Sequence, residues 1–207
     1  GNVNDVSGSG NNGTWQGTGV SHWNPGIPQF GWAGKFNGTD DRVKIACSSG
    51  ANNDNFDLSD FTYSAWIKMD AVPVGWKTII DIDNDKQFLG LSNSTVGIFG
   101  RCGKYFYGNI SAGSWHHIAW SVSGADYKLY LDGQEIGAGT GCNLTPVICD
   151  NGLMIGSGYP GNEYFNGLID EVKIYNKSLS SIEIRQIYTQ GVVSGNKLLA
   201  YYSFEGN

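Results

Sequence analysis

Short segments that mix hydrophobic and polar residues dominate the chain, and turn-forming residues separate them. In segments 61–69, 115–122 and 168–175, aromatic and β-branched residues recur at about every second position. Such alternation is typical of β-strands that bury one face. Segments 76–81 and 88–91 are shorter, and we expect strands there as well.

Two local motifs define a hairpin and a helix. Strand-like residues 127–131 run into Asp132-Gly133, a pair that favours a tight hairpin because both turn positions need positive φ. Ser180 stands three residues before Glu183, the spacing of a capping box, and Gly191 is placed to end the helix that follows. Many short strands and one short helix predict an all-β fold, a two-sheet antiparallel β-sandwich or jelly roll.

Composition narrows the functional class. The 207 residues carry a net charge of −6, with 15% charged and 13% aromatic residues, and this length suits about one domain, residues 1–207. The aromatic content argues against a disordered chain, and the acidic balance argues against nucleic-acid binding. No apolar run is long enough to span a membrane, so we expect no membrane insertion.

The four cysteines, Cys47, Cys102, Cys142 and Cys149, predict two disulfides and therefore an oxidising compartment. Closure of the short loop between Cys142 and Cys149 favours that pair, which leaves Cys47 for Cys102. The alternative is a zinc site, but the closely spaced cysteine pairs that zinc prefers are missing. Asn-x-Ser/Thr sequons occur throughout and permit glycosylation only in a host that performs it. They begin at Asn12, Asn37, Asn93, Asn109, Asn143 and Asn176.

Taken together, several stretches make the chain resemble the laminin-G-like jelly-roll domains of the concanavalin A-like lectin/glucanase superfamily. Each stretch is weak alone, but they occur in the family's order and cover most of the chain. They are residues 5–14, 36–43, 61–67, 115–119, 130–133, 165–172 and 179–188. The resemblance implies the jelly-roll fold, whereas function must be argued from sites.

One departure from the family concerns the last residues. The family's usual first strand resembles Leu198–Glu205, which here stands at the end of the sequence instead of before Asp5. The chain therefore resembles a circular permutant, in which 198–205 supplies that first strand within the same sheet. In the alternative, the chain is one unit cut from a tandem array, and this strand joins a neighbouring unit.

The resemblance also implies a structural calcium ion between the glycine-rich turn 5–13 and the strand that carries Asp170. Calcium takes six to eight oxygen ligands from carboxylates, amides and carbonyls. The predicted ligands are Asp5, Asn11, Asn12, Asp40 and Asp170. The alternative is that the aspartates only cap turns. A second motif, Asp81-x-Asp83-x-Asp85, resembles the start of an EF-hand loop, but Lys86 stands where that loop needs glycine, so we interpret it as a solvated turn.

Aromatic residues in polar and glycine-rich contexts suggest sugar binding, because rings can cover the apolar faces of sugars while polar groups bond the hydroxyls. The alternative role of such residues is to pack loops onto the sheets. The candidate ligand-binding residues are Trp76, Arg101, Tyr105, Tyr107, Tyr159 and Tyr164.

The pattern does not predict an enzyme. Jelly-roll glycosidases need two carboxylates on one strand face, and the adjacent Asp170 and Glu171 would face opposite sides. We therefore predict a non-catalytic recognition module that binds a glycan or polysaccharide, outside the cell or on its surface, within a larger exported protein. The alternative is a spacer or an adhesion domain that binds another surface protein.

Overall fold

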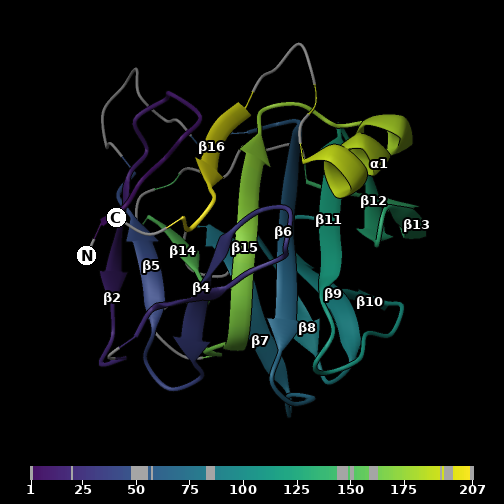
Figure 1. The fold of residues 1–207 in the computed structure, drawn as a ribbon. Coiled ribbons are helices and arrows are strands. Elements are labelled where there is room, and N and C mark those ends of the chain that lie inside the picture. The colour runs from purple at the N-terminus through teal and green to yellow at the C-terminus, as the bar shows by residue number, and fades with distance from the viewer. Residues whose placement is uncertain are drawn as a thin grey trace.

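Two antiparallel β-sheets pack face to face, as the computed structural model of the chain shows (Figure 1). It describes residues 2–19, 21–47, 56, 58–82, 87–143, 149, 152–158, 163–191, 193 and 198–205. The first sheet runs in the order β1 (Asn2–Val3), β2 (Gly13–Gln16), β5 (Arg42–Ile45), β14 (Leu153–Ile155), β7 (Trp76–Ile82), β8 (Gln87–Ser92), β9 (Thr95–Gly100) and β10 (Tyr105–Tyr107).

The second sheet runs in the order β13 (Gln134–Thr140), β12 (Asp126–Leu131), β11 (His116–Ser123), β6 (Phe61–Met69), β15 (Asn166–Tyr175), β4 (Trp32–Asn37) and β3 (Trp23–Pro25). β16 (Leu198–Tyr202) also pairs with β15. It contacts residues 172–175 of that strand, whereas β4 pairs with residues 166–169. The predicted antiparallel sandwich is confirmed. We call the two sheets the first sheet and the second sheet below.

Aromatic and aliphatic side chains fill the space between the sheets. The rings of Phe61 and Tyr63 stack at 4.4 Å, and Trp120 meets both edge-on from the neighbouring strand β11. All three side chains are fully buried. Their alternation along β6 and β11 is the pattern visible in the sequence, so the core follows directly from period-two hydrophobicity.

Helix α1 (Ser181–Gln190) covers one end of the second sheet, in front of β11 and β12 in Figure 1. Its capping box is present, because Ser180 and Glu183 bond each other's backbone N–H. Gly191 ends it in the left-handed region, with φ of 75°. Ile184 and Ile187 pack onto Tyr130 and Tyr175, which confirms the predicted helix, whereas Ile182 is exposed to solvent.

The last strand packs within its own chain. Tyr202 pairs with Val172, is fully buried, and donates its hydroxyl hydrogen to the Asn11 carbonyl at 2.6 Å. The Tyr201 N–H donates to the Asp5 carboxylate at 2.9 Å, and the Tyr201 carbonyl accepts from Val6 N–H. The segments that begin and end the described chain are therefore joined by direct hydrogen bonds.

The predicted disulfide pairing is wrong. The bonds join Cys47 to Cys149 and Cys102 to Cys142. Proximity in space overrides proximity in sequence: Cys47 follows β5 and Cys149 precedes β14, and these two strands are neighbours in the first sheet. Cys102 follows β9 in the first sheet and Cys142 follows β13 in the second, so this bond ties the two sheets together at one edge.

Candidate functional site

The outer face of the first sheet carries a row of aromatic side chains across four adjacent strands. Along β8 and β9, Leu89, Leu91, Val96 and Ile98 belong to the core, so the residues that alternate with them point outward. Cross-strand pairing puts their partners on β7 and β10 on the same face. The outward residues form what we call the aromatic platform: Trp76, Phe88, Phe99 and Phe106.

Ring contacts hold the platform together. The Trp76 ring lies 4.8 Å from the Phe106 ring and meets Phe88 edge-on at 5.0 Å, and Phe88 stacks on Phe99 at 5.2 Å. Phe88 is buried beneath its neighbours, whereas Phe99 and Phe106 are 36% and 40% exposed. The platform therefore offers apolar ring surface to solvent in a fixed arrangement.

A glycine makes this arrangement possible. Gly97 on β9 lies opposite Phe106, and a Cβ atom at this position would come within 2.8 Å of the Trp76 ring. The indole can lie against the strand only because that side chain is absent. Lys104, in the turn before β10, then places its ammonium group 5.2 Å from the centre of the Trp76 ring and 5.7 Å from that of Phe106.

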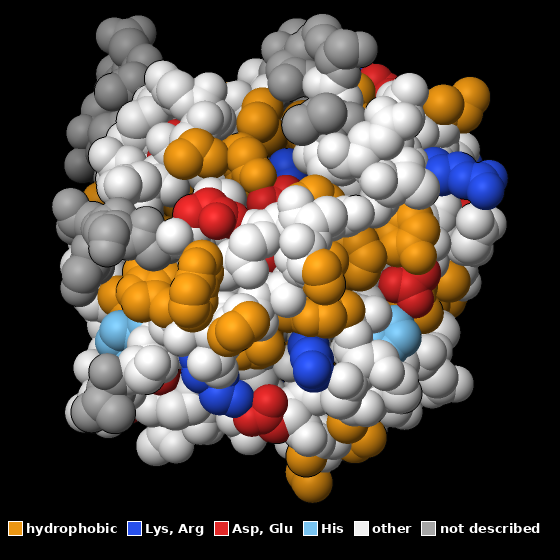
Figure 2. Space-filling model, viewed as in Figure 1, with side chains coloured by type: hydrophobic (Ala, Val, Ile, Leu, Met, Phe, Trp, Pro, Cys, Tyr) orange, Lys and Arg blue, Asp and Glu red, His pale blue; other side chains and the backbone are white. Residues whose placement is uncertain are grey.

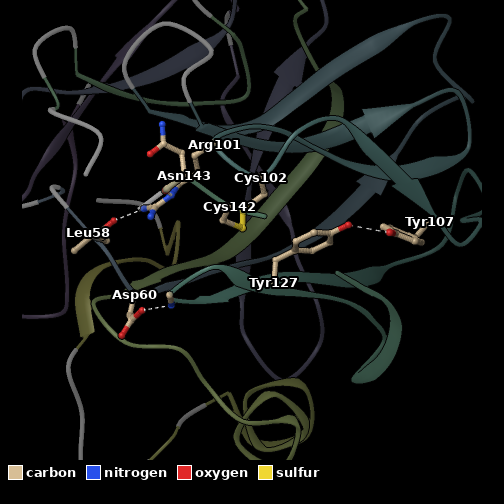
Figure 3. The surroundings of a disulfide bond; sticks show 9 residues. Leu58, Asp60, Arg101, Cys102, Tyr107, Tyr127, Cys142 and Asn143 are labelled. Atoms are coloured by element: carbon tan, nitrogen blue, oxygen red, sulfur yellow. Dashed lines mark hydrogen bonds between the residues drawn. A yellow bond between two sulfur atoms is a disulfide. The ribbon is translucent and has the colours of Figure 1, made fainter. Parts of the chain in front are cut away.

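Two other predicted ligand residues, Tyr105 and Tyr107, lie beside the platform at the open edge of the sandwich. They alternate with Phe106 along β10 and turn toward the second sheet, where the Tyr107 hydroxyl lies 3.0 Å from that of Tyr127 (Figure 3). Tyr105 stacks on Tyr127 at 5.2 Å and remains 38% exposed. Both tyrosines therefore close the edge of the sandwich, and Tyr105 still presents surface to solvent.

Arg101 is buried beside the Cys102–Cys142 disulfide (Figure 3). Its guanidinium group donates to the carbonyl of Leu58 at 2.6 Å and to that of Asn143 at 2.9 Å. The Asn143 N–H in turn donates to the Arg101 carbonyl. These bonds anchor the edge of the sandwich and turn the side chain away from the platform.

Tyr164 lies elsewhere, at the end of the sandwich where the loop after β6 folds back. Its hydroxyl accepts a hydrogen bond from Arg42 at 3.2 Å. It lines a cavity of about 200 Å³ together with Met69, Val72 and Lys77. The remaining predicted ligand residue, Tyr159, lies outside the described residues. Of the six predicted ligand residues, the structure thus places Trp76 on the platform and Tyr105 and Tyr107 next to it.

The predicted calcium ligands separate into three places. Asp5, Asn11 and Asn12 share one turn, in which the Asp5 carboxylate accepts from the N–H groups of Ser7, Asn11 and Tyr201. The Asn12 side chain accepts from Asp5 N–H, and the Asn11 amide donates to the Leu199 carbonyl. These hydrogen bonds order the turn and tie it to β16.

Asp40 lies in a different turn, before β5. Its carboxylate accepts from the Asn37 amide at 2.7 Å and from Thr18 N–H at 3.1 Å. The hydrogen bond from Asn37 lowers the pKa of Asp40, and that from Thr18 adds to the effect. This group therefore caps a turn and remains ionised at neutral pH.

Asp170 is the exception among the predicted ligands. It is fully buried on β15, and its Oδ2 atom has no hydrogen-bond partner among the described residues. Burial, and then the negative charge of Glu171, raise the pKa of Asp170 to about 8. The loop between β3 and β4 crosses in front of β15 (Figure 1), and a Cβ atom on Gly26 in this loop would lie 2.7 Å from Oδ2.

Glu171 lies on the same side of β15 as Asp170, contrary to the expected alternation, because a φ of 51° at Glu171 and a register shift between Asp170 and Lys173 interrupt it. The Glu171 carboxylate accepts from Lys173, which is buried, and from the Tyr201 hydroxyl at 2.5 Å. With Tyr201, Gly31 and Glu205, Glu171 lines a cavity of about 410 Å³ beneath the β3–β4 loop. Figure 2 shows this face, where acidic and hydrophobic side chains lie next to each other. Within the described ranges no group of three or more His, Cys, Asp or Glu residues is arranged to hold a metal ion.

Three members of the platform, Phe88, Phe99 and Phe106, are not among the predicted ligand residues. Phe88 and Phe99 lie in segments where apolar residues occupy both faces of a strand, so the core face could not be distinguished from the outer one. In β9, Gly97 and Phe99 alternate with Val96 and Ile98, and this alternation was the available indication that Phe99 faces outward.

A family model described as the concanavalin A-like lectin/glucanases superfamily matches residues 37–185 of the chain. Among curated proteins, the rat "Sushi, von Willebrand factor type A, EGF and pentraxin domain-containing protein 1" is 27% identical over 89 residues. That match covers 38% of this chain and 2% of the relative. The chain therefore corresponds to a small part of that protein's length.

Solved structures share the fold at low sequence identity. Domain 4 of AbnA, an extracellular arabinanase from Geobacillus stearothermophilus solved with arabinotriose, has a TM-score of 0.72 and 22% identity, covering 90% of this chain and 93% of that domain. A candidate carbohydrate-binding protein from Bacteroides ovatus has a TM-score of 0.70 and 18% identity, covering 84% of this chain and 52% of the other. At these identities the comparison shows the jelly-roll fold.

Proposed function

The chain belongs to the concanavalin A-like lectin/glucanase superfamily, and we propose that it is a non-catalytic module that binds glycans. The observation that carries the proposal is the aromatic platform, in which Trp76, Phe99 and Phe106 present ring faces on one outer surface. Exposed apolar surface gathered in one place is typical of a binding site. The carbohydrate-binding structures with the same fold support the same class of ligand.

The platform suits sugars for a physical reason. A pyranose ring has an apolar face of C–H groups, and stacking removes that face and an aromatic ring from water together. Burying about 100 Å² of apolar surface in this way contributes roughly 2.5 kcal/mol before the entropy of association is subtracted. Because Gly97 and the ring contacts fix the rings, little further ordering is needed when a ligand binds.

The test is a glycan and polysaccharide array followed by titration of the strongest ligand. We expect Trp76→Ala to weaken binding at least about tenfold, because it removes the central ring of the platform. Trp32→Ala is the matched control, since Trp32 is a 48% exposed tryptophan on the second sheet. Equal loss in both variants, or silence across a broad array, would contradict the proposal and favour a spacer or protein-adhesion role.

We also propose a structural calcium ion beneath the β3–β4 loop. The support is that Oδ2 of buried Asp170 has no hydrogen-bond partner among the described residues, and that the Glu205 carboxylate lies near Gly31 of this loop. A bound cation would supply the positive charge that keeps Asp170 ionised despite burial. The residues that fit this role are Asp170 and Glu205, whereas a role for Asp5, Asn11, Asn12 and Asp40 stays a prediction.

Extracellular placement is part of the proposal. Two disulfides close the sandwich, and such bonds persist in oxidising compartments. Among the described residues, no helix has the length and apolar character needed to cross a membrane. A module of this kind would act as one part of a larger exported protein.

A further inference from the structure

Lys104 differs in its surroundings from the lysines that form ion pairs in the structure. Lys35, Lys128, Lys173 and Lys177 each form an ion pair with an Asp or Glu side chain. Lys104 has no such partner in the described parts of the chain, and its ammonium group lies over the exposed rings of the platform.

This placement leaves the charge available to a ligand. The rings of Trp76 and Phe106 attract the ammonium through their negative faces, which holds it at the rim of the platform. The side chain is exposed, so its N–H donors are accessible to a ligand. An ammonium is a compact charge with three rotatable donors, and it accepts one carboxylate oxygen without the planar geometry that arginine requires.

We propose that the platform prefers sugars that carry a carboxylate, an inference that rests on the proposed glycan-binding function. A sugar that stacks its apolar face on Trp76 and Phe106 places its ring substituents at the rim. A carboxylate attached to the ring then lies beside Lys104, where a charge-assisted hydrogen bond forms next to an apolar surface. Such bonds are roughly twice as strong as neutral ones.

The charge of the whole chain does not favour acidic ligands. The net charge of −6 repels an anionic ligand at long range, so a preference for acids has to come from a local contact. Physiological salt screens the long-range repulsion beyond about 8 Å but acts less on a contact pair. Binding of an acidic sugar at this platform therefore depends on one residue, which makes the inference sharply testable.

The experiment compares matched ligands and matched variants by calorimetric titration. The probes are a glucuronate-terminated oligosaccharide and the same oligosaccharide with its carboxylate converted to the methyl ester, which keeps the ring and removes the charge. We expect the acid to bind about tenfold more tightly than the ester, and Lys104→Met to abolish that difference. Lys128→Met is the control, because Lys128 is an exposed lysine on β12 of the second sheet.

Uronates and sialic acids share the carboxylate, and a second pair of ligands separates them. Sialyllactose is compared with lactose in the same variants. The ligand pair whose difference in affinity falls more in Lys104→Met identifies which acidic sugar the platform prefers. Equal binding of acid and neutral forms, unchanged in Lys104→Met, would overturn the inference and leave the glycan-binding function standing. Silence of the wild type across the whole array would overturn both proposals. Where neutral glycans do bind, their loss in Trp76→Ala shows that the platform binds glycans even if Lys104 gives no preference for acids.

Discussion

At the scale of single residues, two adjacent histidines show how the fold assigns different roles to neighbours. His116 and His117 lie on opposite faces of β11, as strand geometry predicts. His116 bonds Asp132 at 2.9 Å, whereas His117 is buried against Trp66 and Tyr188. Burial, with a smaller contribution from the charge of Lys173, lowers the pKa of His117 to about 3. The imidazole is therefore neutral in the folded protein over the physiological range.

A pH dependence of stability follows from His117. Its pKa is near 6.5 in the unfolded chain and about 3 in the folded one, so the unfolded state binds the extra proton between these values. Stability is fully present above pH 6.5 and falls as the pH drops toward 3. Between pH 7.5 and 5.0 this group alone removes about 2 kcal/mol from the free energy of unfolding.

Denaturant unfolding of the wild type and His117→Phe at several pH values measures this contribution. The phenyl ring keeps the aromatic contacts but does not titrate, so the variant loses the part of the pH dependence that His117 supplies. Asp40, whose lowered pKa acts in the same direction, contributes equally to both proteins and cancels in the difference. Parallel pH profiles for the two proteins would contradict the assignment.

At the scale of elements, the sequence predicted the turns and the helix, whose structure depends on residues close together in the chain. The β12–β13 hairpin was predictable because Asp132 and Gly133 both adopt positive φ, at 50° and 74°, and only a few residue types tolerate this. The helix was predictable from its capping box. The cysteine partners and the outer face of β8 and β9 were not, since both depend on which strands become neighbours across the sandwich. The position of Lys104 over Trp76 depends on the same long-range pairing.

The last strand provides a prediction at this scale. Tyr202→Ala removes a fully buried ring and the hydroxyl that donates to Asn11, and we expect it to lower the free energy of unfolding by about 3–5 kcal/mol. Tyr105→Ala, at a 38% exposed tyrosine, should cost less than about 1 kcal/mol. Chemical denaturation of both variants checks this. A similar small effect in each would mean that β16 does not pack in its own sheet in solution.

At the scale of the whole molecule, links between distant segments close the sandwich. One disulfide joins the two sheets at one edge, and the other connects residues that are 102 positions apart in the sequence. Closing a loop of about that length contributes roughly 4–5 kcal/mol by restricting the unfolded chain. The hydrogen bonds of Tyr201 and Tyr202 to the turn 5–13 close the opposite side. The sandwich that carries the aromatic platform is therefore cross-linked at several points.

A calcium ion beneath the β3–β4 loop would add one more link, between that loop, β15 and the residues after β16. Ligand binding to the folded state alone stabilises by about 2.7 kcal/mol at a hundredfold excess over the dissociation constant. For a chain of this size we therefore expect calcium to raise the melting temperature by roughly 5–10 °C relative to chelator, as scanning calorimetry would measure. Asp170→Asn should abolish the shift, because it removes the charge while keeping the shape of the side chain. Asp40→Asn should retain it, since Asp40 lies in a separate turn. The reverse result would place the ion at the turn before β5, and no shift in any of the proteins would rule out a stabilising calcium ion.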